Sequence, residues 1–332
     1  MKYVFLDDNY GVAHILMRDL ELHPDCHVIY KDRTQNNCIL SFILWVLLSV
    51  RIRKWVRIPF KRLWFRMLFR IHFDKDTKVI AMTAGWYHYD WIDYVKASYP
   101  NAKLVLLLRD TVQNKTEFNK EFKIEEAKQK FDLILSYDNV HDVPVYGLTY
   151  APVYMSVMEE LRSCSHACKY DIAWIADAKD RMEIVNRLYR RFMTNGLKCY
   201  FYISHAKKSD KLPDSHIIYA NHYIDRMEML QKELESNCIL EVLKGDASSN
   251  TLRFWEAVIY NKKLYTNWAG AVDSPYYDPR YMKVFNNPDE IDCDFIKEHI
   301  EVDYKYQGEL SPVKLLDIFN QCFGAVSLAT FD

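Results

Sequence analysis

Residues Thr251 to Asn267, TLRFWEAVIYNKKLYTN, decide the fold of this chain. Apolar residues in the first half recur at the spacing of a buried helical stripe, and Asn261 is a typical residue at which a helix ends. Leu264 to Thr266 then have the composition of a short strand that enters a sheet. The stripe is expected to consist of Leu252, Trp255, Ala257, Val258 and Ile259.

The start of this helix has the features of a phosphate site. Backbone N–H groups in a first helical turn are unpaired, and the helix dipole places partial positive charge there. Arg253 can add charge-assisted hydrogen bonds to a phosphate, and Glu256 can accept hydrogen bonds from ribose hydroxyls. The same spacing also fits a plain surface ion pair between Arg253 and Glu256. The first interpretation predicts a nucleotide-sugar site.

The composition is that of a folded, enzyme-sized protein. The chain has 332 residues, of which 50% are hydrophobic and 15% aromatic, and this excludes a disordered protein. Its eight cysteines are scattered, and no secretory leader precedes the first predicted strand, so reduced thiols in the cytoplasm are expected. The formal net charge is −1, yet eight Lys and Arg and no acidic residue fall between Arg51 and Arg70. The positive charge is therefore concentrated in one segment.

Alternating strand and helix patterns predict two α/β domains, each with a parallel sheet covered by helices. The first is expected at 1–160, with an apolar and basic insert at 34–72. The second is expected at 161–332, with a last helix at 312–323 that packs back on the first domain. Because ligands of such sheets bind beyond the carboxyl ends of the strands, we predict two Rossmann-like, doubly wound domains facing across a cleft. Strands are expected at 3–6, 78–82, 103–108, 133–136, 171–175, 198–203, 217–219, 238–242 and 264–266.

The insert at 34–72 has the features of a membrane-associating segment. Its apolar run at 39–50 would be about 18 Å long as a helix, which is too short for a hydrocarbon core of about 30 Å. The next residues interleave aromatic rings with the eight cations, as in helices that lie in a membrane interface and contact anionic lipids. The membrane-associating residues are expected to be Trp55, Arg62, Trp64, Arg66 and Arg70.

Two other interpretations of this insert stay open. Its apolar side could pack on the protein core while its cations are solvated. It could also follow a nucleic-acid backbone, although the acidic remainder of the chain and the lack of a nucleic-acid motif argue against that partner. The membrane interpretation predicts peripheral attachment at the cytoplasmic face, on anionic lipids of the inner leaflet.

Four stretches of the chain carry a resemblance to a known family. In these stretches the chain resembles bacterial GT-B glycosyltransferases that build capsular, exopolysaccharide or lipopolysaccharide glycans. The resemblance implies the GT-B fold and a second domain that binds a nucleoside diphosphate sugar. The stretches are YPNAKLVLLLRD at 99–110, FDLILSYDNVHDVPVYGLTYAPVY at 131–154, YDIAWIADAKDRMEIVNRLYRRFMTNGLKCYFYI at 170–203 and SNCILEVLKGDASSNTLRFWEAVIYNKKLYTN at 236–267.

The resemblance also implies roles for residues of the second domain. Lys179 and Arg181 are similar to diphosphate contacts. Asn250, Thr251 and Arg253 are similar to the phosphate site between loop and helix. Glu256 is similar to the ribose-binding acid, and Glu241 is a further donor-side candidate at a longer separation than the usual glutamate pair. The chain departs from the pattern at Ala176, where a glycine is often found, and at 109–112, where an Asn-Pro type turn is replaced.

Glycosyl transfer with inversion also needs a base that takes the proton of the acceptor hydroxyl. Asp8 and His14 follow the first strand, and His88 and Asp90 follow a later one, so each of them is a candidate for that base. A retaining enzyme needs no such residue.

No metal is expected to be required. Asp74-Lys75-Asp76 and Asp292-Cys293-Asp294 spell a metal-binding Asp-x-Asp, but their positions before a strand and at a helix start indicate turns and caps. The nucleotide-sugar is thus expected as a co-substrate, with no cofactor.

The leading hypothesis is a membrane-associated glycosyltransferase that moves a sugar onto a glycan or a lipid-linked acceptor. An enzyme that uses GDP-fucose or a CMP-sugar is one alternative. A non-catalytic membrane adaptor with a degenerate nucleotide fold is the other, and it predicts no stabilisation by a donor.

Overall fold

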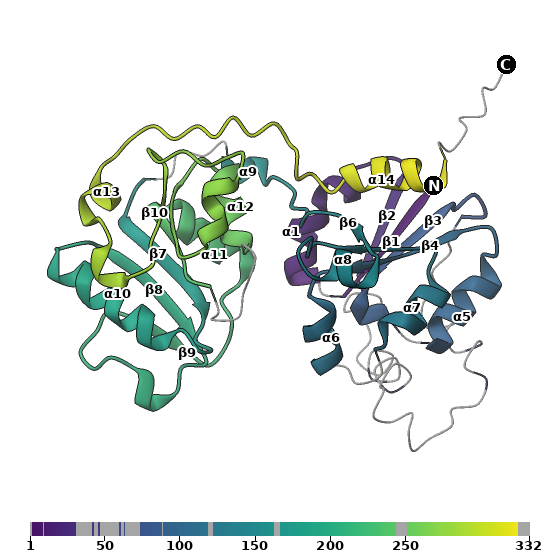
Figure 1. Ribbon diagram of the computed structural model, residues 1–332, viewed down its shortest axis with the longest axis horizontal. Helices are drawn as coiled ribbons and strands as arrows, with labels where there is room; N and C mark the ends of the chain where they lie inside the picture. Colours follow the sequence, from purple (N-terminus) through teal and green to yellow (C-terminus); the bar gives the residue numbers. More distant parts are fainter. Residues whose placement is uncertain are drawn as a thin grey trace. The chain divides into compact units, whose positions relative to one another are not determined.

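The computed structural model describes residues 2–8, 10–30, 42, 46, 60, 63, 74–87, 89–118, 122–162, 167–243 and 251–324. The chain divides into two compact units (Figure 1). The first consists of residues 1–156 together with 309–332, and the second of residues 157–308. Apart from four single positions, the insert predicted at 34–72 lies outside the described residues, as do all five of its predicted membrane-associating residues.

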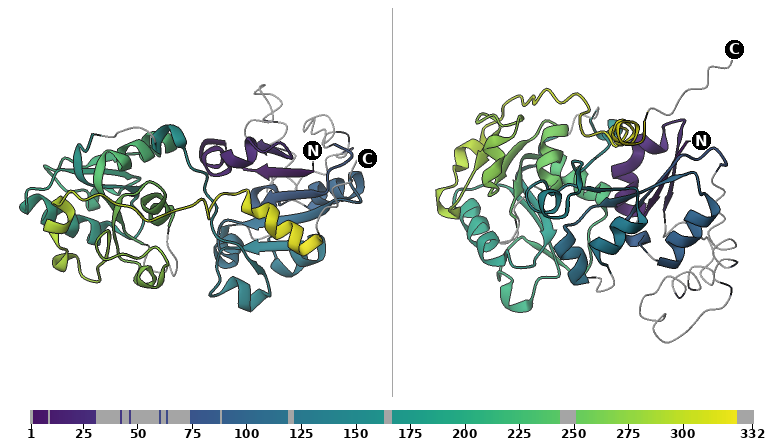
Figure 2. Two further views of the ribbon diagram at one scale, coloured as in Figure 1. Left: turned by 90° about the horizontal axis from the view of Figure 1, so that it is seen from above. Right: turned by 45° about the vertical axis from the view of Figure 1, so that its right-hand side comes forward.

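The first unit is built on six parallel strands in the order β2-β1-β3-β4-β5-β6. Figure 2 shows this unit, with its purple to blue strands, from two further sides. Its central strands are apolar runs, such as KLVLLL in β4, because both faces of the sheet are buried. The strands are β1 (Tyr3–Asp7), β2 (Cys26–Tyr30), β3 (Val79–Thr83), β4 (Lys103–Leu108), β5 (Leu133–Ser136) and β6 (Thr149–Tyr150). The helices are α1 (Tyr10–Glu21), η2 (Ala84–Trp86, a 3₁₀ helix), α5 (Tyr89–Ser98), α6 (Val112–Phe118), α7 (Ile124–Lys130), α8 (Asp142–Tyr146) and α14 (Lys314–Phe323).

The last helix, α14, is part of the first unit. The ring of Phe319 stacks on Tyr3 and Phe5 of β1, with ring centroids 6.3 and 6.0 Å apart. The Tyr3 hydroxyl donates a hydrogen bond of 2.9 Å to Asn320 Oδ1. Both ends of the described chain therefore pack in one core.

The second unit repeats this architecture with six parallel strands in the order β12-β11-β10-β7-β8-β9. The strands are β7 (Tyr170–Asp177), β8 (Cys199–Ser204), β9 (Ile218–Ala220), β10 (Ser236–Glu241), β11 (Lys263–Thr266) and β12 (Met282–Val284). The helices are α9 (Glu159–Arg162), α10 (Met182–Thr194), η3 (Lys208–Asp210), α11 (Arg226–Leu234), α12 (Leu252–Ile259), η4 (Ala269–Asp273), η5 (Pro288–Glu290) and α13 (Cys293–Lys297).

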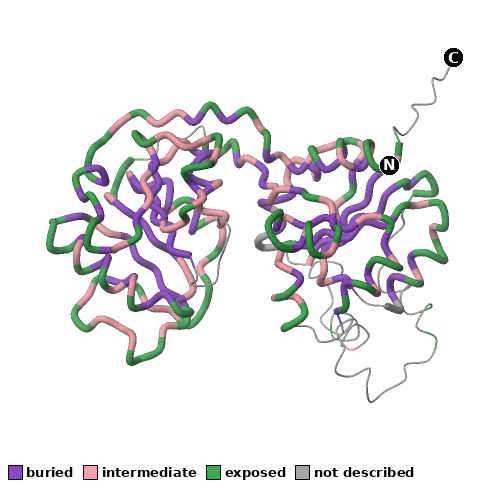
Figure 3. The backbone as a smooth tube through the Cα atoms, viewed as in Figure 1, coloured by how far each residue is buried: buried purple, intermediate pink, exposed green. Residues whose placement is uncertain are grey.

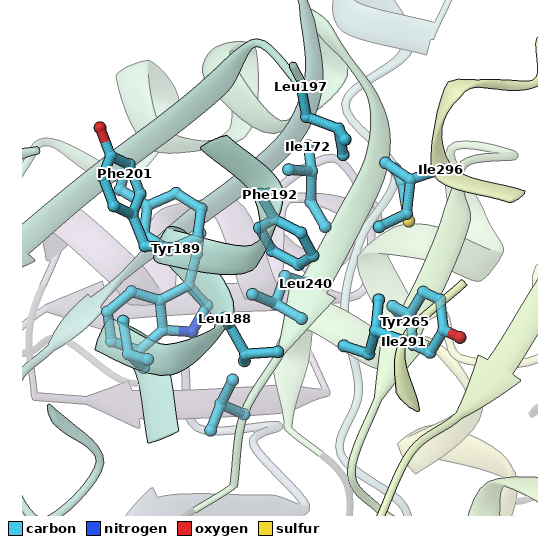
Figure 4. Packing of buried hydrophobic residues seen from close by; sticks show 14 of the residues in the cluster. Ile172, Leu188, Tyr189, Phe192, Leu197, Phe201, Leu240, Tyr265, Ile291 and Ile296 are labelled. Carbon is cyan, nitrogen blue, oxygen red and sulfur yellow. The ribbon is translucent and has the colours of Figure 1, made fainter. Parts of the chain in front are cut away.

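The main core of the second unit lies between the sheet and helix α10. Figure 3 shows that buried segments follow the strands in each unit. In Figure 4, Leu188 and Phe192 of α10 lie near Ile172 of β7 and Leu240 of β10, and all four are fully buried. Because burial of each such side chain stabilises the fold by about 1.5–3 kcal/mol, this packing fixes α10 on the sheet.

Each sheet has one point where the strand order reverses. In the first unit the chain moves outward from β1 to β2 on one side and continues with β3 on the other. In the second unit the same reversal lies between β7 and β10. Ligands of doubly wound sheets bind in the crevice outside the carboxyl ends of the strands at such a switch point. The segments that follow β7 and β10 are therefore the first place to look for a site.

The elements differ from the sequence prediction in three respects. The edge strands β2, β6 and β12 were not expected, because short edge strands have weak apolar patterns. The buried face of α12 contains Phe254, whereas Leu252 and Trp255 are only half-buried, because the Phe254 ring packs edge-on against Trp268 at 5.2 Å. The polar Glu256 is also inside.

Asp292 is a helix cap, as predicted. Its Oδ1 atom accepts hydrogen bonds from the backbone N–H groups of Asp294 and Phe295 at the start of α13. Within the described part of the chain, every helix falls short of the length and apolar character that crossing a bilayer requires.

Candidate functional site

Arg181 joins the ends of β7 and β10 at the switch point of the second unit. It follows β7, and its guanidinium donates a hydrogen bond of 3.0 Å to the carbonyl oxygen of Val242, just after β10. A second hydrogen bond goes to the carbonyl oxygen of Asp177. The guanidinium carbon lies 5.4 Å from the ring centroid of Trp174. Only 8% of Arg181 is exposed, so the switch point carries a fixed, buried positive charge.

Arg253 places a second guanidinium close to the first. It lies in the first turn of α12, where the hydroxyl oxygen of the N-cap residue Thr251 accepts a hydrogen bond of 3.2 Å from the Arg253 backbone N–H. Burial, followed by repulsion from the Arg253 charge, lowers the pKa of Arg181 to about 10. Two guanidinium groups that repel each other beside a helix N-terminus favour an anion near them.

Glu241 links the start of α12 to the sheet through hydrogen bonds. This glutamate is fully buried at the end of β10. Its Oε1 atom accepts hydrogen bonds from the Thr251 backbone N–H at 2.8 Å and from the Thr251 hydroxyl at 2.6 Å. Its Oε2 atom accepts one from the Thr266 hydroxyl at 2.6 Å. Because both oxygens already have partners, Glu241 orients the helix start and leaves ligand contact to other groups.

Glu256 is buried inside the unit and pairs with a residue of another helix. It is fully buried on α12, and Arg226 of α11 donates to its Oε1 atom. Arg253 pairs with Glu233 of α11, at 3.3 Å between Nε and Oε1. Arg253 and Glu256 therefore do not pair with each other, and the interpretation of their spacing as a surface ion pair is wrong. The Oε2 atom of Glu256 is also buried, and no group among the described residues donates a hydrogen bond to it.

Lys179 lies in the turn between β7 and α10. It is exposed and has a left-handed backbone with φ of 45°, which a non-glycine residue adopts at an energetic cost. Asn250, the other predicted phosphate contact, lies outside the described residues, as does the rest of 244–250.

His205 and Asp177 form a pair that sequence reasoning missed. Asp177 ends β7 and His205 follows β8, which is paired in parallel with β7. The Nδ1 atom of His205 lies 3.0 Å from Asp177 Oδ1, and the His205 ring packs edge-on against Tyr223 at 4.8 Å. His205 also has a left-handed backbone, with φ of 55°. The register of β7 and β8, which places Asp177 opposite Ser204, was the signal that could have found this pair.

Asp8 occupies the switch point of the first unit. Its Oδ1 atom accepts a hydrogen bond of 2.8 Å from the Thr83 hydroxyl, and its Oδ2 atom accepts one of 3.1 Å from the Gly85 backbone N–H. A Cβ atom at Gly85 would collide with the Asp8 carboxylate, so only glycine permits this approach. Beside it, the buried Asp7 forms an ion pair with the exposed Arg109, with 2.8 Å between Asp7 Oδ1 and an Arg109 nitrogen.

His14 has a carboxylate partner. Its Nδ1 atom lies 2.9 Å from the carboxylate of Glu21, which is seven residues further along, at the end of α1. Glu21 in turn accepts a hydrogen bond from the Tyr30 hydroxyl at the end of β2. His14 is 30% exposed, so its ring is accessible to solvent. The helix α5 contains Asp90, but its side chain lies outside the described residues, and His88 is outside them altogether.

Among the described residues, no group of three or more His, Cys, Asp or Glu side chains is arranged to hold a metal ion.

Some solved structures are similar to this chain over nearly its whole length. An α-glucosyltransferase solved with UDP and a 13-mer DNA that contains an HMU base is 13% identical, with a TM-score of 0.51 over 97% of this chain and 89% of that one. The UDP-GlcNAc 2-epimerase of Methanocaldococcus jannaschii, solved with UDP-GlcNAc and UDP, is 11% identical, with a TM-score of 0.49 over 97% of this chain and 100% of that one. No family model and no curated protein sequence matches the chain.

The similarity to the glucosyltransferase, together with two doubly wound sheets of six parallel strands, decides the architecture. The chain has the GT-B fold. Within this GT-B fold, the switch point of the second unit carries Arg181 and Arg253, and that of the first unit carries Asp8. The GT-B architecture expected from the sequence is thereby confirmed.

Proposed function

We propose that this protein is a glycosyltransferase that moves a sugar from a nucleoside diphosphate sugar to a glycan or lipid-linked acceptor, in the synthesis of a cell-surface polysaccharide. One observation carries the proposal: Arg181 and Arg253 converge at the switch point of the second unit, beside the N-terminus of α12. Two guanidinium groups and the positive end of the α12 dipole match the two negative charges of a diphosphate. In support, the α-glucosyltransferase of the same fold was solved with UDP.

Each donor-side residue receives a role in this proposal. Lys179, Arg181, Asn250, Thr251 and Arg253 bind the diphosphate, and Glu256 is the acid that serves the ribose. Glu241 holds Thr251 and so positions the helix start. When the bond from sugar to phosphate breaks, negative charge grows on the departing diphosphate, and fixed cations stabilise it without reorganisation. The proposed enzyme therefore needs no metal, and EDTA should leave its activity unchanged.

For an inverting reaction, His14 is the stronger candidate for the base. Both Asp8 oxygens already accept hydrogen bonds, from Thr83 and Gly85, whereas Glu21 orients the partly exposed His14 ring through its Nδ1 atom. Asp90 remains a further candidate on the same unit.

The insert at 34–72 supports a second part of the proposal, peripheral attachment to the cytoplasmic face of the membrane. This part rests on the sequence alone, where aromatic residues alternate with eight cations.

Sedimentation with vesicles tests the membrane attachment. Wild-type protein should sediment with vesicles that contain anionic phosphatidylserine and stay in solution with neutral phosphatidylcholine. The triple variant Arg62→Ser, Arg66→Ser, Arg70→Ser should lose about 3 kcal/mol of vesicle affinity, at about 1 kcal/mol per cation. Equal sedimentation of the variant would reject the attachment.

A thermal-shift screen tests the donor site. Purified protein is incubated with UDP, GDP, dTDP, CMP and their sugars, with Arg253→Ala and Glu256→Gln as site variants. Arg187→Ala is the matched control, because Arg187 is exposed on α10 and pairs with Asp289. One nucleotide should stabilise the wild-type protein and the control, by about 2.7 kcal/mol at a hundredfold excess over its dissociation constant. Loss of that shift in both site variants supports the transferase. No shift with any nucleotide would favour the adaptor.

A further inference from the structure

Helices α11 and α12 enclose a cluster of four charged side chains next to the proposed donor site. Glu233 and Arg226 come from α11, and Arg253 and Glu256 come from α12. Both carboxylates are 0% exposed, and the guanidinium side chains of Arg226 and Arg253 are 12% and 14% exposed. Two acids and two cations this deeply buried are costly unless each is fully paired.

The cluster is incompletely paired. Arg253 Nε lies 3.3 Å from Glu233 Oε1, which is an ion-pair distance, but their orientation does not make a hydrogen bond. Among the described residues, no group donates a hydrogen bond to either oxygen of Glu233, although the residue is fully buried. Its acid neighbour Glu256 can accept a hydrogen bond from it when Glu233 is protonated. A buried carboxylate without hydrogen bonds is strongly disfavoured in its ionised form. The nearby guanidinium groups are therefore the groups that favour the ionised form of Glu233.

The charges around Glu233 determine its protonation. It faces Arg226 on its own helix, and Arg253 and Glu256 on α12. Glu241 at the end of β10 acts on the same Arg253, while β7 and β8 present apolar and tyrosine side chains around Met229 of α11. Burial, followed by repulsion from Glu256, raises the pKa of Glu233 well above its ordinary value, and the two arginines oppose this rise.

In the proposed enzyme, Glu233 and a bound diphosphate compete for the positive charge of Arg253. On one side it pairs with Glu233, and on the other it lies close enough to Arg181 to lower the pKa of that residue. A diphosphate that binds between the two arginines adds negative charge beside Arg253. That charge weakens the attraction of Arg253 for Glu233, and Glu256 still repels Glu233.

We propose that Glu233 is a positioning residue that holds Arg253 in the free protein and takes up a proton when a nucleoside diphosphate binds. The proposal rests on the proposed function, because it needs the diphosphate at Arg253. One proton moves from the buffer to a Glu233 carboxylate oxygen, so the buried cluster keeps its charge balance when the ligand arrives. Arg253 then pairs with the ligand, and the neutral side chain of Glu233 stays beside Arg253.

The direction of the pH dependence follows from this proton uptake. Above the pKa of Glu233 in the free protein, each binding event takes up a proton, so affinity falls as the pH rises. The limit is about tenfold in Kd per pH unit, which corresponds to one proton. Below that pKa, Glu233 is protonated both with and without ligand, so this residue contributes no pH dependence.

Isothermal titration calorimetry tests the proposal on the full chain. UDP-glucose, GDP-mannose and dTDP-glucose are titrated from pH 6 to 9 in buffers with different ionisation enthalpies. Sugars esterified to the terminal phosphate are used because a free terminal phosphate titrates near pH 6. The buffer dependence of the observed enthalpy gives the number of protons taken up. Wild-type protein should approach one proton per bound nucleotide at the upper end of the range.

Two variants test whether Glu233 is the residue that takes up the proton. Glu233→Gln keeps the shape of the side chain, so it should bind the same nucleotide, take up no proton and lose the pH dependence of Kd. Glu235→Gln is the matched control, because Glu235 lies two positions away, is also buried and pairs with Lys169 and Lys232; it should behave as wild type. Nucleotide binding by wild type without proton uptake would overturn the role of Glu233 and leave the donor site intact. No binding of any of the three would overturn the proposed function itself.

Discussion

The guanidinium of Arg181 donates a hydrogen bond of 3.0 Å to the carbonyl oxygen of Val242, which lies 61 residues further along the chain. This bond joins the ends of two strands that are neighbours only because the strand order of the sheet reverses between them. It fixes a positive charge at the place where doubly wound sheets bind their ligands. The same residue holds the local fold and, in the proposed enzyme, contacts the diphosphate.

Replacing Arg181 by Met should reduce both stability and nucleotide binding. The variant keeps much of the apolar length but leaves the carbonyl groups of Asp177 and Val242 without their charged donor. We expect a loss of about 1.5–3 kcal/mol in the free energy of unfolding, measured by urea denaturation, and no thermal shift with nucleotide. Arg190→Met on the exposed side of α10 is the control and should change neither. An Arg181→Met protein as stable as wild type would show that the bridge contributes nothing.

The contact between Gly85 and Asp8 can be tested by a double-mutant cycle. Gly85→Ala places a methyl group on the Asp8 carboxylate and should cost about 1–3 kcal/mol. Asp8→Ala removes the obstacle together with the hydrogen bonds to Thr83 and Gly85. Because the two changes relieve one another, the double variant should be more stable than the sum of the single effects predicts. Strict additivity in urea denaturation would mean that the two residues do not touch.

Glu241 should make stability depend on pH. Burial raises its pKa above the ordinary value, more than its hydrogen bonds to Thr251 and Thr266 lower it. A carboxyl group with a raised pKa in the folded state contributes stability below its unfolded pKa, and this contribution is lost as the pH rises through the folded pKa. Urea denaturation between pH 4 and 8 should therefore show wild type losing stability relative to Glu241→Gln as the pH rises. The opposite trend would mean that the ionised form is the favoured one.

His205 has a strained backbone, and we expect its imidazole to contact the ligand. Both His205→Gly and His205→Ala remove the imidazole that faces Asp177, but only glycine adopts φ of 55° without cost. The Gly variant should therefore be more stable than the Ala variant by up to about 1 kcal/mol, measured by thermal unfolding. If His205 contacts the donor, both variants should bind nucleotide equally weakly in calorimetry. Wild-type affinity in both would limit His205 to the turn.

Much of the fold could be predicted from local pattern. Apolar runs such as those of β4 and β7 are buried on both faces, so their composition alone indicates central strands. The helix at 252–259 and the strand after it follow from spacing and from the break at Asn261, which has a left-handed φ of 52°. The edge strands β2, β6 and β12 could not be predicted, because few buried side chains constrain an edge.

The sequence by itself determined that this is an α/β chain with two doubly wound halves, because period and composition are local properties of the residues. It also indicated the start of α12 as an anion site, since helix termini carry their partial charges wherever they lie. Only the tertiary structure decided which groups face one another. Arg253 and Glu256 are three positions apart, yet each pairs with a residue of α11, because helix packing and parallel strand pairing set neighbours that sequence separation does not reveal.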